Sequence, residues 1–247
     1  MKRFTSDDEI ECLCEAMILD FFRSRKIKNP MCVDIDSFVS GYLGIPIVYE
    51  TFAEPDPGRV GFLSDGVRPL AVRRGEKVEQ IVFPIRTAVI EKYLLKPGES
   101  PRRRFTIAHE GAHDVLSRHI PLQTNPAAAF HSEYDNEATY SKEMLQEMMS
   151  VNEFFTNRAA ACFLMPRFLV ERSLKLHNSA QRVIRYDNGV LSQDQKLTIQ
   201  KMADTLGVSY TALYLRLDEL NLFECRPIGE YLRSGLRYGG EQNAESC

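Results

Sequence analysis

The sequence predicts an α+β protein that combines several helices with a small, twisted, mostly antiparallel sheet. Amphipathic helical patterns mark the N-terminal segment and most of the chain after residue 100. Between them, residues 46–83 contain short β-branched runs separated by turn residues. The composition, with 44% hydrophobic and 26% charged residues, is that of a globular protein with a substantial core.

The N-terminal part is expected to contain two helices. Ser6 is a candidate N-cap, and the acidic residues 7–9 that follow it suit the first turn of a helix ending near Arg25. Either Asp34 or Asp36 is expected to cap a shorter helix that Gly44 closes.

The next stretch is expected to form four strands, at residues 46–50, 59–63, 70–73 and 78–83. Residues 87–95 are expected to form another helix, which Pro97 and Gly98 break. Ser100 and Pro101 then suit the N-cap and first position of a long helix.

That helix carries the pattern H-E-x-x-H at His109, Glu110 and His113. Residues four apart lie on one helix face, so the two imidazoles can converge on one Zn²⁺ ion. The carboxylate beside them can accept a proton from the attacking water. Chance would give this pattern in about one of a hundred chains of this composition. The sequence therefore predicts a catalytic zinc site.

A catalytic zinc site needs a third protein ligand, and two candidates exist. His119 has the spacing of an H-E-x-x-H-x-x-G-x-x-H site, but Leu116 occupies the position where that motif has glycine. Glu153, on a helix expected at 143–164, is the better candidate. Asn157 lies one turn later on the same face and can accept a hydrogen bond from a ligating histidine.

The C-terminal part is expected to contain two helices around a tight turn at residues 207–209, which resembles a helix-turn-helix. We therefore expect a catalytic domain at 1–190, a helix-turn-helix-like segment at 191–225 and a flexible tail at 226–247. Residues 198–224 contain two basic and four acidic residues, which disfavours DNA binding.

Composition excludes several other classes. The net charge of −3 offers no broad attraction for nucleic acid or membranes, and no apolar run approaches the roughly 20 residues that cross a bilayer. The six cysteines form no C-x-x-C pair, and the start of the chain is acidic where a signal peptide would be apolar. We expect a cytoplasmic protein with reduced thiols.

The two motifs together resemble the ImmA/IrrE family of bacterial and phage-associated metallopeptidases. The resemblance is carried by residues 104–113, which read RFTIAHEGAH, and by Glu153, Asn157, Ala160 and residues 164–166, which read LMP. It implies a zincin-like domain with a gluzincin-like zinc site. It also implies a cytoplasmic location and a protein substrate, namely a helix-turn-helix repressor encoded nearby.

Under this hypothesis His109, His113 and Glu153 bind Zn²⁺ and Glu110 is the general base. An edge strand at 78–83 could hold the substrate by β-augmentation. Two alternatives stay open: a catalytically silent metal-binding sensor or partner-docking protein, and a DNA-binding regulator that uses the C-terminal helices. The sequence leaves the scissile bond, the activating signal and the oligomeric state open.

Overall fold

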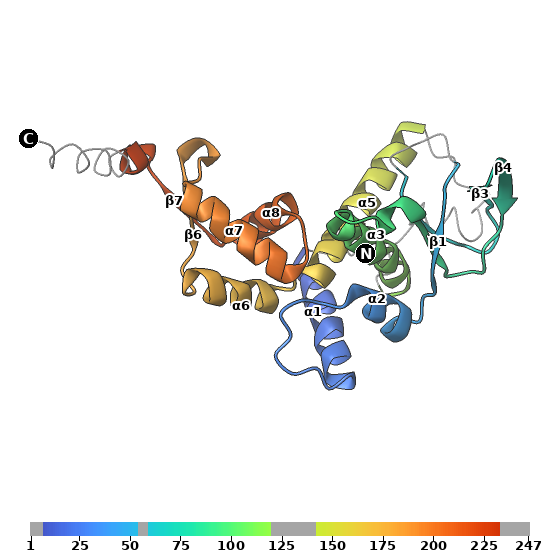
Figure 1. Ribbon diagram of the computed structural model, residues 1–247, viewed down its shortest axis with the longest axis horizontal. Coiled ribbons are helices and arrows are strands. Elements are labelled where there is room, and N and C mark those ends of the chain that lie inside the picture. The colour runs from blue at the N-terminus through green and yellow to red at the C-terminus, as the bar shows by residue number, and fades with distance from the viewer. Residues whose placement is uncertain (1–6, 54–58, 120–141, 233–247) are drawn as a thin grey trace, which may run out of the picture. The chain divides into compact units, whose positions relative to one another are not determined.

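The chain forms two compact units, Met1–Arg167 and Phe168–Cys247 (Figure 1). They are seen in a computed structural model that describes residues 7–53, 59–119 and 142–232. The boundary expected at residue 190 falls inside the second unit. The division into a catalytic domain and a helix-turn-helix-like segment stays a prediction. In the described ranges no helix has both the length and the apolar character needed to cross a membrane.

The first unit contains four α-helices, two short helical segments of other types and five strands among its described residues. The helices are α1 (Asp7–Ser24), α2 (Ile35–Ser37), α3 (Ser100–His119) and α5 (Lys142–Leu164), with the π-helical η1 (Phe38–Tyr42) and the 3-10 helix η2 (Lys92–Leu95). The strands are β1 (Ile47–Glu50), β2 (Gly61–Leu63), β3 (Leu70–Arg74), β4 (Lys77–Ile81) and β5 (Ala88–Glu91).

The strands form a three-stranded sheet in the order β1-β5-β2 and a separate β3-β4 hairpin. β5 pairs parallel with β1 and antiparallel with β2, and β3 pairs antiparallel with β4. A bridge between Phe52 and Val72 links the hairpin to the segment after β1. The described part of this unit is therefore an α+β structure with a small, mostly antiparallel set of strands, and the predicted class is confirmed.

The helix expected at 87–95 is wrong. Residues Ala88–Glu91 form the central strand β5, and the helical turn is limited to Lys92–Leu95. The side chains of Ala88, Val89 and Ile90 are fully buried. Pairing on both edges and burial on both faces favour a strand for this β-branched run, and local periodicity could not distinguish the two states.

The N-terminal helices follow the predicted pattern in outline. Asp34 is the N-cap of α2, and its carboxylate accepts a hydrogen bond from the Ser37 backbone N–H at 3.1 Å. Gly44, with φ +69°, follows the helical segment and allows the chain to turn into β1. Ser6 lies outside the described residues, as does the loop expected at 119–142 apart from its ends.

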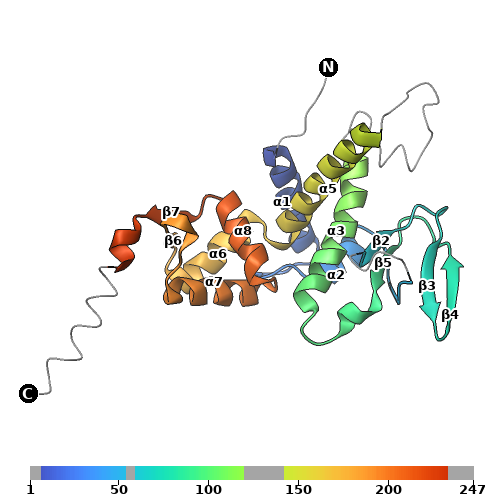
Figure 2. The same ribbon diagram turned by 90° about the horizontal axis from the view of Figure 1, so that it is seen from above.

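The helices α1, α5 and α3 pack side by side, with α5 in contact with both others (Figure 2). The rings of Phe38 and Phe163 meet in this helical core with centroids 5.0 Å apart. β2 and β5 lie against α3, and the face of β2 that carries Phe62 packs into a second cluster with Leu70, Val72, Phe83 and Val89. As a result, α3 lies between α5 and β2.

The second unit contains α6 (Arg167–Asn178), β6 (Val183–Tyr186), η3 (Asp187–Gly189), α7 (Gln193–Leu206), α8 (Tyr210–Glu219) and β7 (Phe223–Arg226). α7 ends at Gly207, with φ +68°, and the Ser209 side chain caps α8 by accepting the Ala212 backbone N–H at 3.2 Å. The helix pair and its turn were predicted, but the parallel pairing of β6 with β7 was not. Of the expected tail, residues 228–232 are helical and 233–247 lie outside the described residues.

Candidate metal centre

The helix α3 brings the two histidines of the H-E-x-x-H pattern to one point. It runs without interruption from Ser100 to His119, so His109 and His113 lie one turn apart on the same face. Their rings meet edge to face with centroids 4.6 Å apart, and their Nε2 atoms are 3.0 Å apart. Both side chains are partly exposed, so the point where they converge is open to solvent.

Glu153 completes the group from α5. Its Oε2 lies 3.3 Å from His109 Nε2 and its Oε1 lies 3.5 Å from His113 Nε2. Ligands about 2.0–2.1 Å from a tetrahedral Zn²⁺ would be separated by about 3.3 Å. The three observed separations therefore fit two imidazoles and one carboxylate around a single ion. The ligand atoms of these three residues lie close enough together to hold a metal ion.

The far ring nitrogens support this arrangement. His109 Nδ1 lies 3.0 Å from Asn157 Oδ1, and His113 Nδ1 lies 3.4 Å from Thr156 Oγ1. Asn157 Oδ1 can only accept, so Nδ1 of His109 carries a proton, and its Nε2 either donates to Glu153 when the ring is charged or presents a lone pair to a metal ion when the ring is neutral. If the Thr156 hydroxyl also accepts, the two neutral rings would direct their lone pairs to the point that the Glu153 carboxylate faces, so a proton or a metal cation there would relieve the repulsion.

The structure does not favour His119 as the third ligand. α3 continues through Leu116 to His119 and makes no turn back toward His109. Ten residues along a helix correspond to about 15 Å, which is too far for both histidines to contact the same ion.

Glu110 lies on α3 between the two histidines and is buried, with 4% of its surface exposed. Burial raises the pKa of Glu110 to about 7; the charge of Glu153 acts in the same direction, whereas His109, Arg59 and the Leu63 backbone N–H oppose it. A buried carboxyl group with a raised pKa, next to three converging candidate ligand atoms, makes Glu110 a candidate general base.

The charges of the candidate ligands influence one another in the metal-free protein. The hydrogen bond from His109 lowers the pKa of Glu153 despite its partial burial. Burial alone would lower the pKa of His109, but the Glu153 hydrogen bond and the charges of Glu110 and Glu153 raise it. The site therefore attracts positive charge, whether a proton or a metal ion.

Thr156 and a group of charged residues near the site were not predicted. The buried Asp114, next to His113, accepts hydrogen bonds from Arg86 Nε at 2.8 Å and Nη2 at 3.1 Å and also pairs with Arg118. Arg86 donates further to the Leu43 carbonyl at 2.9 Å. The ion pair ties the H-E-x-x-H helix to the segment before β5. An acidic residue directly after the second histidine was a visible signal, but its arginine partner comes from a distant part of the chain.

Residues 95–218 match the family model of the IrrE N-terminal-like domain, which defines peptidase family M78. This range includes the two histidines, Glu110, Glu153 and both partners of the histidine rings. The chain belongs to this peptidase family. No curated protein matches the chain. Membership of family M78 implies a protein substrate, and the chemistry of the three converging side chains indicates a metal ion.

The match extends into the second unit of this M78-family chain. There, α8 offers little positive charge to attract nucleic acid. Its one basic residue, Arg216, is buried, whereas Asp218 and Glu219 are exposed.

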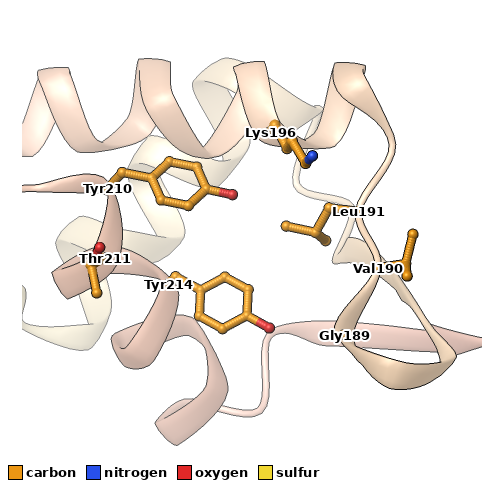
Figure 3. A pocket seen from close by; sticks show the side chains of 7 residues that line it. All are labelled: Gly189, Val190, Leu191, Lys196, Tyr210, Thr211 and Tyr214. Atoms are coloured by element: carbon orange, nitrogen blue, oxygen red, sulfur yellow. The ribbon is translucent and has the colours of Figure 1, made fainter.

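A pocket of about 380 Å³ lies on the same unit, where Tyr210 and Tyr214 of α8 face Leu191 and Lys196 (Figure 3). This surface offers two aromatic rings with hydroxyl groups, apolar side chains and one lysine.

Proposed function

We propose that the protein is a zinc-dependent endopeptidase that cleaves a specific helix-turn-helix repressor. The observation that carries this proposal is the buried Glu110 carboxyl group beside the converging His109, His113 and Glu153 side chains. Membership of family M78 supports peptide-bond hydrolysis, and the proposal adds zinc, the roles of the residues and the substrate class.

His109, His113 and Glu153 would hold the ion, and two imidazoles with one carboxylate are a donor set suited to catalytic zinc. When bound, Zn²⁺ would polarise the scissile carbonyl and lower the pKa of water. Asn157 and Thr156 would keep the imidazole rings in the orientation and tautomer that binding requires.

Glu110 would move the proton in both halves of the reaction. Its carboxylate would accept a proton from the attacking water and then give it to the leaving amine. In the metal-free protein burial raises the pKa of Glu110 to about 7, and the charge of a bound Zn²⁺ would lower it, so near neutral pH the carboxylate would be ionised and able to accept the proton.

The substrate would lie extended along β2. The Glu91 N–H donates to the Val60 carbonyl and the Ser64 N–H donates to the Thr87 carbonyl, so the alternate residues Gly61 and Leu63 direct their backbone groups away from β5. The Leu63 N–H donates to Glu110, so the Gly61 backbone groups and the Leu63 carbonyl would pair with the substrate. β2 is the edge of its sheet among the described strands, and it lies against α3. These features favour β2 over the expected 78–83 strand as the site of β-augmentation.

The direct test is to incubate the purified protein with a helix-turn-helix repressor encoded by a neighbouring gene. We expect one or a few defined cleavage products with Zn²⁺ present and none after chelation. Glu110→Gln should keep its zinc and reduce the cleavage rate by at least about 100-fold, because the variant cannot accept the proton. If Glu110→Gln cleaved at the wild-type rate, the general-base role would be wrong. If the wild-type protein bound zinc but cleaved nothing, the result would favour a metal-binding sensor.

A further inference from the structure

We propose that Gly61 is a positioning residue for Glu110. Its missing side chain provides the space in which β2 contacts the Glu110 carboxyl group, and any larger residue would displace that group. The proposal rests on the proposed function in taking Glu110 as the general base. It adds a residue outside the family-model match, on a strand far from α3 in the sequence.

The close approach is visible in the distances around Gly61. A Cβ at this position would overlap Oε1 of Glu110, lie 3.0 Å from its Cδ and lie 2.7 Å from Thr106 Cγ2. Real Cβ atoms essentially never come closer than 3.0 Å to such a neighbour. Gly61 is not among the glycines with positive φ, so the limited space, and not the backbone angle, requires glycine here.

The strand cannot retreat from the helix to make room. The Glu91 N–H donates to the Val60 carbonyl and the Ser64 N–H donates to the Thr87 carbonyl, each at 2.9 Å, so both ends of β2 are held to β5. The side chain of Phe62 is buried in the cluster on the opposite face of the strand. The carboxyl group of Glu110 would therefore move, because it is the flexible end of a side chain.

A displaced carboxylate would leave the metal ligands in place and remove the base from the attacking water. For Gly61→Ala we expect kcat to fall by about 100-fold, the effect typical of a misplacement of about 1 Å, with KM changed less than about threefold. Zinc affinity, measured by competition with a chelating dye, should stay within about threefold of the wild-type value. A loss of general packing would not produce this separation of kcat from metal binding.

The contact itself can be tested without activity, by urea denaturation of the metal-free protein. Thr106→Ser removes the Cγ2 methyl group and keeps the hydroxyl that donates to the Arg102 carbonyl, so it serves as the common background. Gly61→Ala should lower the urea midpoint in this background and leave it unchanged when Glu110→Ala is also present. If the first combination failed to fold and the second folded, the result would support the same conclusion.

Gly41→Ala is the matched control. A Cβ there would overlap Arg25 Nη2, but Arg25 is exposed and can move into solvent, so kcat should be unchanged and the urea midpoint should not fall. Equal midpoint losses for Gly61→Ala with and without the Glu110 carboxyl group would overturn the proposal, as would wild-type kcat in Gly61→Ala. Absence of cleavage by the wild type would contradict the proposed function alone, because the denaturation cycle still tests the contact.

Discussion

Glu110 places an ionisable group where water is almost excluded. Folding raises its pKa from 4.5 to about 7, chiefly through burial, so the metal-free protein holds this proton more tightly than the unfolded chain does. A carboxyl group of this kind stabilises the fold while it is protonated, and the contribution is lost as the pH rises through 7. The residue that suits general-base chemistry therefore carries a cost in stability at neutral pH.

This cost predicts a pH-dependent effect of Glu110→Gln on the metal-free protein. At pH 8 the variant should be the more stable by about 3 kcal/mol, since each pKa unit corresponds to about 1.4 kcal/mol. At pH 4.5 the difference should be close to zero, because the wild-type carboxyl group is then protonated in the folded state. Urea denaturation in the presence of chelator would measure both values, and a difference independent of pH would contradict the raised pKa.

At the scale of residues, the sequence predicted the candidate site residues that helix periodicity brings together. His109 and His113 converge because a helix repeats every 3.6 residues, and Glu153 and Asn157 share a face for the same reason. Gly61 and Arg86 were not predicted, because their partners Glu110 and Asp114 lie far away in the sequence. Only tertiary packing brings these segments together.

α5 contributes one proposed zinc ligand, Glu153, and the hydrogen-bond partners of both histidine rings. Glu153, Thr156 and Asn157 lie at positions i, i+3 and i+4, so one face of the helix presents a carboxylate, a hydroxyl group and an amide to α3. Their relative positions are fixed by the helix backbone, and α5 packs along α3. The orientation of the histidine rings therefore depends on how these two helices pack.

Thr156→Val should consequently weaken zinc binding. Valine has nearly the same shape but cannot hydrogen-bond to His113 Nδ1, so we expect the zinc dissociation constant to rise about 10-fold or more. Thr156→Ser keeps the hydroxyl and should stay within about threefold of the wild type. Competition with a chelating dye would give these constants; equal affinities in the valine and serine variants would mean that the hydroxyl does not orient His113.

Among the elements, helices with strong periodicity were predicted and paired strands were predicted less well. The ranges of α3 and α5 match the expected helices within a few residues, because their apolar faces are visible in the local pattern. β5 was expected as a helix, and β6 and β7 were not expected at all. A short strand is defined by its neighbours, which the local pattern does not contain.

At the scale of the whole molecule, the division between the units was not visible in the sequence. The chain passes from the first unit to the second near Arg167. The residues just before it, Leu164, Met165 and Pro166, are buried, and no Gly- or Ser-rich linker separates the units. A boundary without a linker gives no change in composition, so the expected boundary was placed at residue 190, where the predicted C-terminal helix pair begins.

All three proposed zinc ligands belong to the first unit, and this predicts a selective thermal effect of the metal. A ligand that binds only the folded state stabilises it by about 2.7 kcal/mol when free zinc is 100 times the dissociation constant. For a unit of this size the gain corresponds to a rise of about 5–10 °C in melting temperature. Calorimetry should therefore show a zinc-dependent shift of the transition of Met1–Arg167 and an unchanged transition of Phe168–Cys247. His113→Ala should abolish this shift in melting temperature, because the two remaining ligands would bind zinc weakly. A shift of the same size in that variant would show that zinc stabilises the protein at another site.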